Sequence, residues 1–206
     1  YEFAARELKK LGVTTVGYEE NYITVGEFSA LQSALNGFSL VPASGALALK
    51  RAVKTEEEIS KIENSQRIAE KALAKVIPLI KPGVTEREIS AELTFVMLQS
   101  GADGLAFDNI VSFGENSANP HHHPSDKKLD KNELILIDFG ARKDGYCSDM
   151  TRTFTLGNPH DELKAIHGIV SEAQAYALKH IKAGITGKEA DSLAREYIRA
   201  NGYVKE

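Results

Sequence analysis

The sequence predicts an α+β protein in two parts, and three observations support this prediction. Short strands alternate with helices over residues 1–53, which is typical of a small α/β unit. From residue 54 onward the pattern changes to amphipathic helices that come in pairs. Between the two pairs, Leu134–Leu156 has aliphatic, β-branched and aromatic residues on both sides of Asp144-Gly145, as a β-hairpin should. Residues 54–206 are therefore expected to form the larger domain.

The first part is expected to be the C-terminal part of an α/β domain. Glu2–Leu11 predicts a helix that ends at Gly12, and Val13–Tyr18 predicts a strand. A second helix is predicted after the capping box Thr24-Val-Gly-Glu27, and a second strand at Phe38–Val41. Because the chain starts with Tyr and opens directly in a helix, it is expected to lack the start of this domain.

The helix pairs of the second part repeat at a constant spacing. Thr55 is the predicted N-cap of a long amphipathic helix, and Thr85-Glu-Arg-Glu88 caps the next one. Ile80–Glu88 matches Ile181–Glu189, and Gly101 falls on Gly202 at the same separation. If this repeat reflects duplication, each half consists of two helices followed by strands. The second half then stops before its strands, so the chain is expected to be cut short.

Two aspartates in the predicted hairpin indicate a metal site. Leu134–Ile137 is a continuous aliphatic run, typical of a strand that is covered on both faces. A four-residue loop at 142–145 puts Asp138 directly opposite Asp149, whereas a two-residue loop at 144–145 puts them diagonally on one face. In either register, two like charges meet beside an aliphatic strand, and a hard divalent cation would relieve their repulsion. The alternative is one structural Asp and one solvated Asp near a turn.

The composition excludes several classes of protein. Of the 206 residues, 42% are hydrophobic and 26% are charged, which is typical of a globular protein with a real core. The net charge of −4 provides no basic surface for nucleic acid. No apolar stretch reaches membrane-spanning length, and no signal-peptide pattern is present, so no membrane partner is expected. The single Cys147 excludes an internal disulfide and is compatible with the cytoplasm.

Three groups of residues make the sequence similar to the pita-bread metallopeptidases. They are Phe107-Asp-Asn-Ile-Val111, Asn116-Ser-Ala-Asn-Pro-His121, and Asp138-Phe-Gly140 with Ser148-Asp-Met-Thr-Arg-Thr153. This family includes Xaa-Pro dipeptidase (prolidase), Xaa-Pro aminopeptidase, creatinase and methionine aminopeptidase. The segment that precedes the motifs resembles the linker and N-terminal domain of the prolidase and creatinase branch. The resemblance implies that residues 54–206 form the first part of a pita-bread catalytic domain.

The resemblance also implies a site with two divalent ions, often manganese, cobalt or zinc. In the family, two Asp, one His and two Glu hold the metals. Asp138 and Asp149 correspond to the two Asp, whereas the His and both Glu belong to the family's second half, after Glu206. His121 corresponds to a different family histidine, which contacts the bound peptide near the scissile bond. We expect Mn²⁺ to be the metal.

The segment after His121 departs from the family pattern. The family usually has Gly at the next position, whereas this chain continues with His122, His123 and Pro124. Adjacent histidines on a loop rarely converge on one ion, so no metal role is expected for His122 or His123.

The implied function is metal-dependent hydrolysis of the peptide bond before proline. The substrate would be a peptide with proline in the second position, and the enzyme would be a cytoplasmic homodimer. A non-catalytic pita-bread binding module and a creatinase-like C–N hydrolase are the alternatives. Because two carboxylates are too few to hold two ions tightly, the 206-residue chain alone is expected to be inactive.

Overall fold

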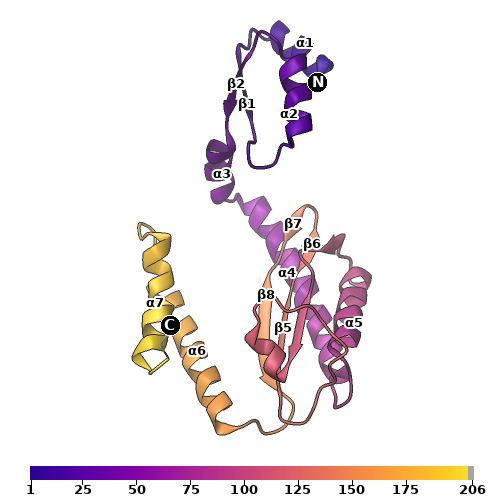
Figure 1. Cartoon of the computed structure of the whole chain (residues 1–206), viewed down its shortest axis with the longest axis vertical. Helices are drawn as coiled ribbons and strands as arrows, with labels where there is room; N and C mark the ends of the chain where they lie inside the picture. The colour runs from indigo at the N-terminus through magenta and orange to yellow at the C-terminus, as the bar shows by residue number, and fades with distance from the viewer. Residues whose placement is uncertain (204–206) are drawn as a thin grey trace. The chain divides into compact units, whose positions relative to one another are not determined.

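The computed structural model describes residues 1–203, which divide between two compact units (Figure 1). The first unit is Tyr1–Ile59 and the second begins at Ser60. The division falls inside helix α4 (Glu56–Val76), so one continuous helix belongs to both units. The domain limits 1–53 and 54–206 stay a prediction.

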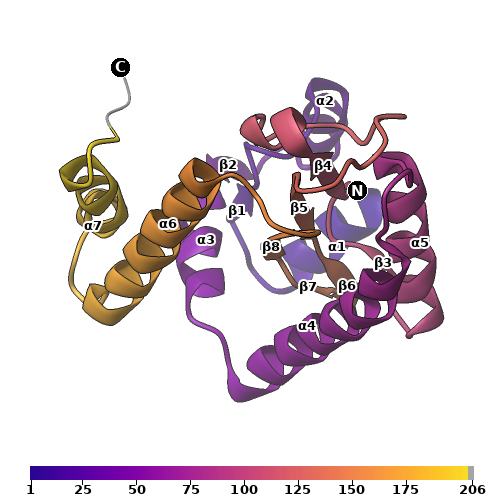
Figure 2. The same cartoon turned by 90° about the horizontal axis from the view of Figure 1, so that it is seen from below.

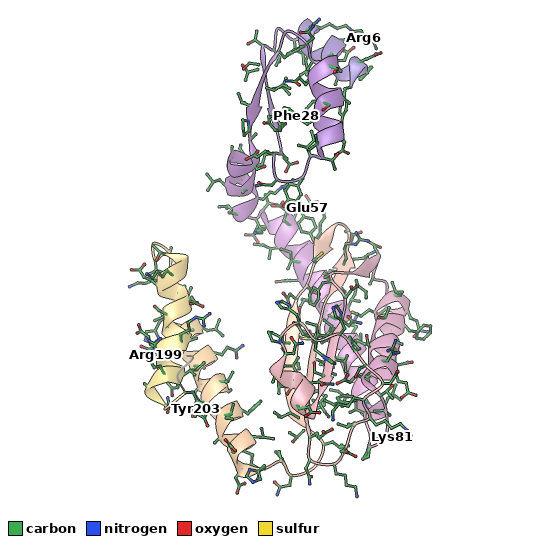
Figure 3. The ribbon with its side chains drawn as sticks, viewed as in Figure 1. Arg6, Phe28, Glu57, Lys81, Arg199 and Tyr203 are labelled. Carbon is green, nitrogen blue, oxygen red and sulfur yellow. The ribbon has the colours of Figure 1, made fainter. Side chains whose placement is uncertain are left out.

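The first unit is a small α/β arrangement. Its elements are α1 (Glu2–Lys10), β1 (Thr15–Tyr18), α2 (Val25–Ala34), β2 (Ser39–Pro42) and α3 (Ser44–Ala52). Strands β1 and β2 pair in parallel, as strands connected through a helix do. Helix α2 begins with the predicted capping box of Thr24 and Glu27. Phe28 of this helix lies toward the strands, with its ring centroid 4.9 Å from that of Tyr18 (Figure 3).

Helix α3 was not among the elements predicted from the sequence. The residue at its N-cap position, Ala43, has no side chain that could cap a helix. The capping acceptor comes instead from Glu20, whose Oε2 accepts hydrogen bonds from the backbone N–H groups of Ala43 and Ser44. A cap supplied from a distant part of the chain leaves no signal in the local sequence.

The second unit contains two antiparallel three-stranded sheets and two pairs of helices (Figure 1). One sheet has the order β4-β5-β8 and the other the order β3-β6-β7. After α4 the elements are η1 (Ile77–Leu79), α5 (Glu86–Gln99), β3 (Gly104–Leu105), β4 (Ile110–Phe113), η2 (Gly114–Ala118), β5 (Leu134–Phe139), β6 (Ala141–Lys143), β7 (Tyr146–Cys147), β8 (Met150–Thr155), α6 (Asp161–His180) and α7 (Gly187–Ala200).

The core lies between one face of the β4-β5-β8 sheet and helices α4 and α5, which line the same side of the strands (Figure 2). Burial alternates along β5: Ile135, Ile137 and Phe139 are fully buried, whereas the residues between them are partly exposed. The expectation that the aliphatic run 134–137 is covered on both faces is therefore wrong for the described residues. Helices α4 and α5 pack against one face only, and the other face, which carries Asp138, borders an open groove.

The predicted repeat is visible in the helices. Helices α5 and α7 each have 14 residues and begin with the same capping box, Thr85 with Glu88 and Thr186 with Glu189. Their packing differs. Helices α4 and α5 both contribute to the core, whereas α6 and α7 pack along each other (Figures 1 and 2).

In residues 1–203, none of the helices is both long enough and apolar enough to cross a membrane.

Candidate functional site

The register of the hairpin decides whether the side chains of Asp138 and Asp149 lie directly opposite each other or diagonally. Asp144 and Gly145 both have positive φ, 52° and 81°, as a two-residue type I′ turn requires. Lys143 pairs with Tyr146 on either side of this turn. Farther along, Asp138 pairs with Thr151, so the continued register brings Asp149 beside Gly140. The four-residue loop is therefore wrong, and the two-residue loop is correct: the aspartates lie diagonally on one face.

The hairpin is irregular at the level of Asp149. Gly140 separates β5 from β6, and a Cβ at this position would collide with the carbonyl oxygen of Ser148. The buried Ser148 hydroxyl accepts a hydrogen bond from the Ala141 backbone N–H, 3.0 Å away. Ser65 of α4, also buried, donates its hydroxyl to the Ala141 carbonyl oxygen. These contacts fix the backbone directly before Asp149.

The electrostatics of Asp138 are those of a carboxylate that lacks a positive partner. Burial raises the pKa of Asp138, the Thr151 hydroxyl lowers it, and the negative charge of Asp149 raises it again, so that the pKa lies above its ordinary value. Among residues 1–203, no group donates a hydrogen bond to the buried Oδ1 atom of Asp138. Asp149 itself is exposed.

This donor set fits a hard divalent cation in its chemistry. A buried carboxylate oxygen without a donor, next to a second carboxylate on the same face, offers the oxygen ligands that such ions prefer. It does not form a complete site. Within the described part of the chain, no three His, Cys, Asp or Glu side chains converge as a metal centre requires.

The three histidines of the loop occupy different environments. His121 is exposed, and its backbone N–H donates to Asn119 Oδ1 at 3.0 Å. In residues 1–203 it forms no hydrogen bond or ion pair with Asp138 or Asp149, so the structure does not join it to the aspartates. His123 is exposed, whereas His122 Nε2 lies 2.8 Å from Glu86 Oε2. His122 thus contacts a carboxylate on α5.

Glu86 was not predicted from the sequence as a functional residue, although its side chain is fully buried. An acidic residue in the first turn of a helix is ordinarily explained by its attraction to the positive end of the helix dipole. That explanation applies to exposed residues as well, so the sequence contained no signal that Glu86 is buried.

An open groove lies on the face that carries Asp138. It has a volume of about 720 Å³ and runs between the sheet and helix α6. Leu136, Thr151 and Thr153 line it from the sheet, and Ile166 and Val170 line it from the helix. Because Leu136 and Asp138 alternate with buried residues along β5, both point to this side. The groove combines apolar side chains with hydroxyl groups.

Residues 60–206 match the sequence profile of metallopeptidase family M24. The chain belongs to this family. The Xaa-Pro dipeptidase of Pyrococcus furiosus is 44% identical over 153 residues, which are 74% of this chain and 44% of that protein.

Two solved structures share the fold over almost the whole chain. The X-Pro aminopeptidase of Thermotoga maritima is 41% identical with a TM-score of 0.91, and the match covers 98% of this chain and 57% of that one. The Xaa-Pro dipeptidase of Bacillus anthracis is 41% identical with a TM-score of 0.92 and the same coverage. The predicted pita-bread fold class is confirmed, for the part of the domain that this chain spans. The chain spans about half the length of the curated relatives it matches, 56% and 53% in two cases.

Proposed function

We propose that the protein containing this chain is a metal-dependent Xaa-Pro peptidase, which hydrolyses the peptide bond before proline. The observation that supports this most directly is the geometry of Asp138 and Asp149. Both lie on the open face of the hairpin, and Asp138 Oδ1 is buried without a donor in the described residues. The membership in family M24 and the Xaa-Pro peptidases among its relatives support the same reaction.

In this proposal Asp138 and Asp149 hold two divalent ions together with later ligands that the resemblance implies, one His and two Glu. When bound, such ions supply an activated water molecule and polarise the scissile carbonyl. The chain itself positions the carboxylates. β5 anchors Asp138 in the sheet, and the buried contacts of Ser148 hold the backbone before Asp149.

His121 is proposed to contact the substrate near the scissile bond, as the resemblance implies. Its ring is exposed and its backbone is held by Asn119, so the side chain is accessible to a peptide. The groove beside Leu136 and Thr153 would receive part of that peptide.

Three finer features belong to the same proposal. We propose Mn²⁺ as the metal and a homodimer as the assembly, both from the resemblance to the pita-bread enzymes. We propose the cytoplasm as the location, because a chain with one cysteine and no disulfide suits a reducing compartment.

Titration with Mn²⁺ of a longer polypeptide that includes the later ligand segments, followed by electron paramagnetic resonance, tests the metal ligands. Asp138→Asn and Asp149→Asn are each expected to weaken binding by at least about tenfold, because each removes a charged ligand. Asp144→Asn is the matched control. It makes the same charge change in the same hairpin, and Asn tolerates the positive φ of that turn position. Equal losses in all three variants would contradict the assignment.

An assay with an Xaa-Pro dipeptide and a longer Xaa-Pro peptide tests the reaction. The 206-residue chain alone is expected to cleave neither peptide. A longer polypeptide that includes the later ligand segments is expected to turn over at about 1–10³ s⁻¹. Cleavage of the dipeptide alone would indicate a dipeptidase, and cleavage of both an aminopeptidase. A longer polypeptide that binds Mn²⁺ and cleaves neither peptide would support the binding-module alternative, and hydrolysis of creatine would support the creatinase-like one.

A further inference from the structure

The Glu86 carboxylate accepts five hydrogen bonds within the second unit. It is the first residue of α5, and its side chain has no exposed surface. Its Oε1 accepts from the Phe113 backbone N–H at 2.8 Å and from Asn116 Nδ2 at 2.9 Å. Its Oε2 is 2.8 Å from His122 Nε2, 2.9 Å from the Ser125 backbone N and 2.6 Å from Ser125 Oγ.

All of these partners belong to one segment, residues 113–125, and they lie on both sides of His121 in the sequence. Phe113 and Asn116 precede His121, while His122 and Ser125 follow it. The Glu86 carboxylate on α5 thus contacts this segment at four residues. When a segment is held by hydrogen bonds on both sides of a residue, that residue has little conformational freedom, because each hydrogen bond restricts the backbone conformations of the segment.

The partners are sufficient to keep the carboxylate charged. Burial raises the pKa of Glu86, but the hydrogen bonds from Ser125, Asn116, His122 and Phe113 outweigh this effect and bring the pKa to about 2. Hydrogen bonds to an ionised acceptor are stronger than those between neutral groups. A neutral side chain of the same size could not hold the loop equally well.

An ordinary role at the helix terminus does not explain this arrangement. Glu88 lies in the same first turn of α5, and its carboxylate accepts hydrogen bonds from the backbone N–H and hydroxyl of Thr85. Glu88 is exposed, and those contacts belong to its capping box. Glu86 reaches away from the helix to the loop instead. His122 adds one more donor to it.

We propose that Glu86 is a positioning residue: it anchors residues 113–125 and thereby sets the position of the His121 side chain toward a bound peptide. This inference rests on the proposed role of His121 in the peptidase reaction. Glu86 acts through the loop and does not itself touch substrate.

The test uses the 206-residue chain without metal or peptide, so its result does not depend on peptidase activity. In Glu86→Gln, the ring signals of His121 and His122 in a ¹H–¹³C spectrum are expected to shift and broaden. The amide hydrogens of Phe113 and Ser125 should exchange at least about tenfold faster, because each loses a charged acceptor. Glu88→Gln, in the same helical turn, is the matched control and should leave these signals and exchange rates unchanged.

A second variant keeps the test decisive if Glu86→Gln does not fold. His122→Gln removes only the partly exposed imidazole, and it is expected to shift the His121 ring signal and to speed exchange at Ser125. The proposal would be overturned if the His121 ring signals in both variants were the same as in the unchanged chain. If Glu86→Gln does not fold, the same result in His122→Gln alone would overturn it. The amide of Ile135 is the control for general destabilisation. Its hydrogen exchange rate should be the same in the variants as in the unchanged chain, whereas a faster rate would indicate loss of overall stability. In the active longer polypeptide, Glu86→Gln should lower kcat more than it changes KM. If peptide cleavage is never observed, the ring signals still decide the anchoring.

Discussion

The pairs α4–α5 and α6–α7 begin from the same local signals and end in different environments. Helices α5 and α7 share their length and their capping box. Yet α5 buries four large apolar side chains, Ile89, Leu93, Val96 and Met97, whereas α7 has no fully buried residue. Local sequence is therefore sufficient to form each helix, but it does not decide whether the helix becomes part of a core.

The sheet accounts for this difference. The first pair covers the face of β5 that carries Ile135, Ile137 and Phe139. Helix α6 faces the other side of the sheet across an open groove, and its buried residues are Ala173 and Ala177. Large apolar residues of α6 remain exposed, among them Val170 at 51% and Leu178 at 69%. In the described part of the chain, the second pair depends mainly on contacts between its own two helices.

The largest expected difference concerns equivalent positions of the repeat, Met97 and Ile198. Met97→Ala is expected to reduce the free energy of unfolding by about 2–5 kcal/mol, because its fully buried side chain would leave a cavity. Ile198→Ala should cost less than about 1 kcal/mol, because the side chain is partly exposed. Hydrogen exchange of amides within α5 and α7 measures both effects. Equal losses would mean that α7 is as well packed as α5.

Acid should weaken the first pair more than the second, in which the pKa of the exposed Glu189 is lowered by its contacts with Thr186. The pKa of Glu86 is lowered from 4.5 to about 2 in the folded chain, so its stabilising effect is fully present above pH 4.5. The effect is lost as the pH falls from 4.5 toward 2, and amounts to about 3 kcal/mol. Gly187 occupies the equivalent position at the start of α7 and has no charge to lose.

Hydrogen exchange of α5 amides measures this acid effect. At each of several pH values, the free energy of unfolding is obtained from exchange in a series of urea concentrations and extrapolated to zero urea. In Glu86→Gln the dependence should flatten between pH 4.5 and 2, with Glu88→Gln as the exposed control. An unchanged acid profile in Glu86→Gln would show that other carboxylates control it.

The smallest effects concern one glycine from each region. Gly140→Ala should destabilise the hairpin by about 1–3 kcal/mol, because the new methyl group meets the Ser148 carbonyl oxygen. Gly168→Ala in α6 should instead stabilise by up to about 1 kcal/mol, since Ala is the better helix former and nothing lies within 4 Å of its Cβ. Urea denaturation, followed by circular dichroism, compares the two. A tolerated alanine at residue 140 would show that the hairpin backbone near Asp149 can move.

The capping boxes and the hairpin turn could be predicted from the sequence because their determinants are local. Thr24, Thr85 and Thr186 each cap a helix with the Glu three positions later. Asp144-Gly145 forms the two-residue turn that places Asp138 and Asp149 on one face. This choice between two registers was open in the sequence, because both loop lengths were compatible with the same residues.

The sequence by itself determined where the helices with local capping boxes begin and where the hairpin turns, since backbone preferences and caps act over a few residues. Only the tertiary structure decided that one face of β5 is buried and the other carries Asp138, because an aliphatic run reads the same whichever face is covered. Likewise, only the tertiary structure decided that the Glu86 side chain is buried. Burial of a charge depends on donors that converge from elsewhere, and Phe113, Asn116, His122 and Ser125 reach it only once β4 and its following loop pack against α5.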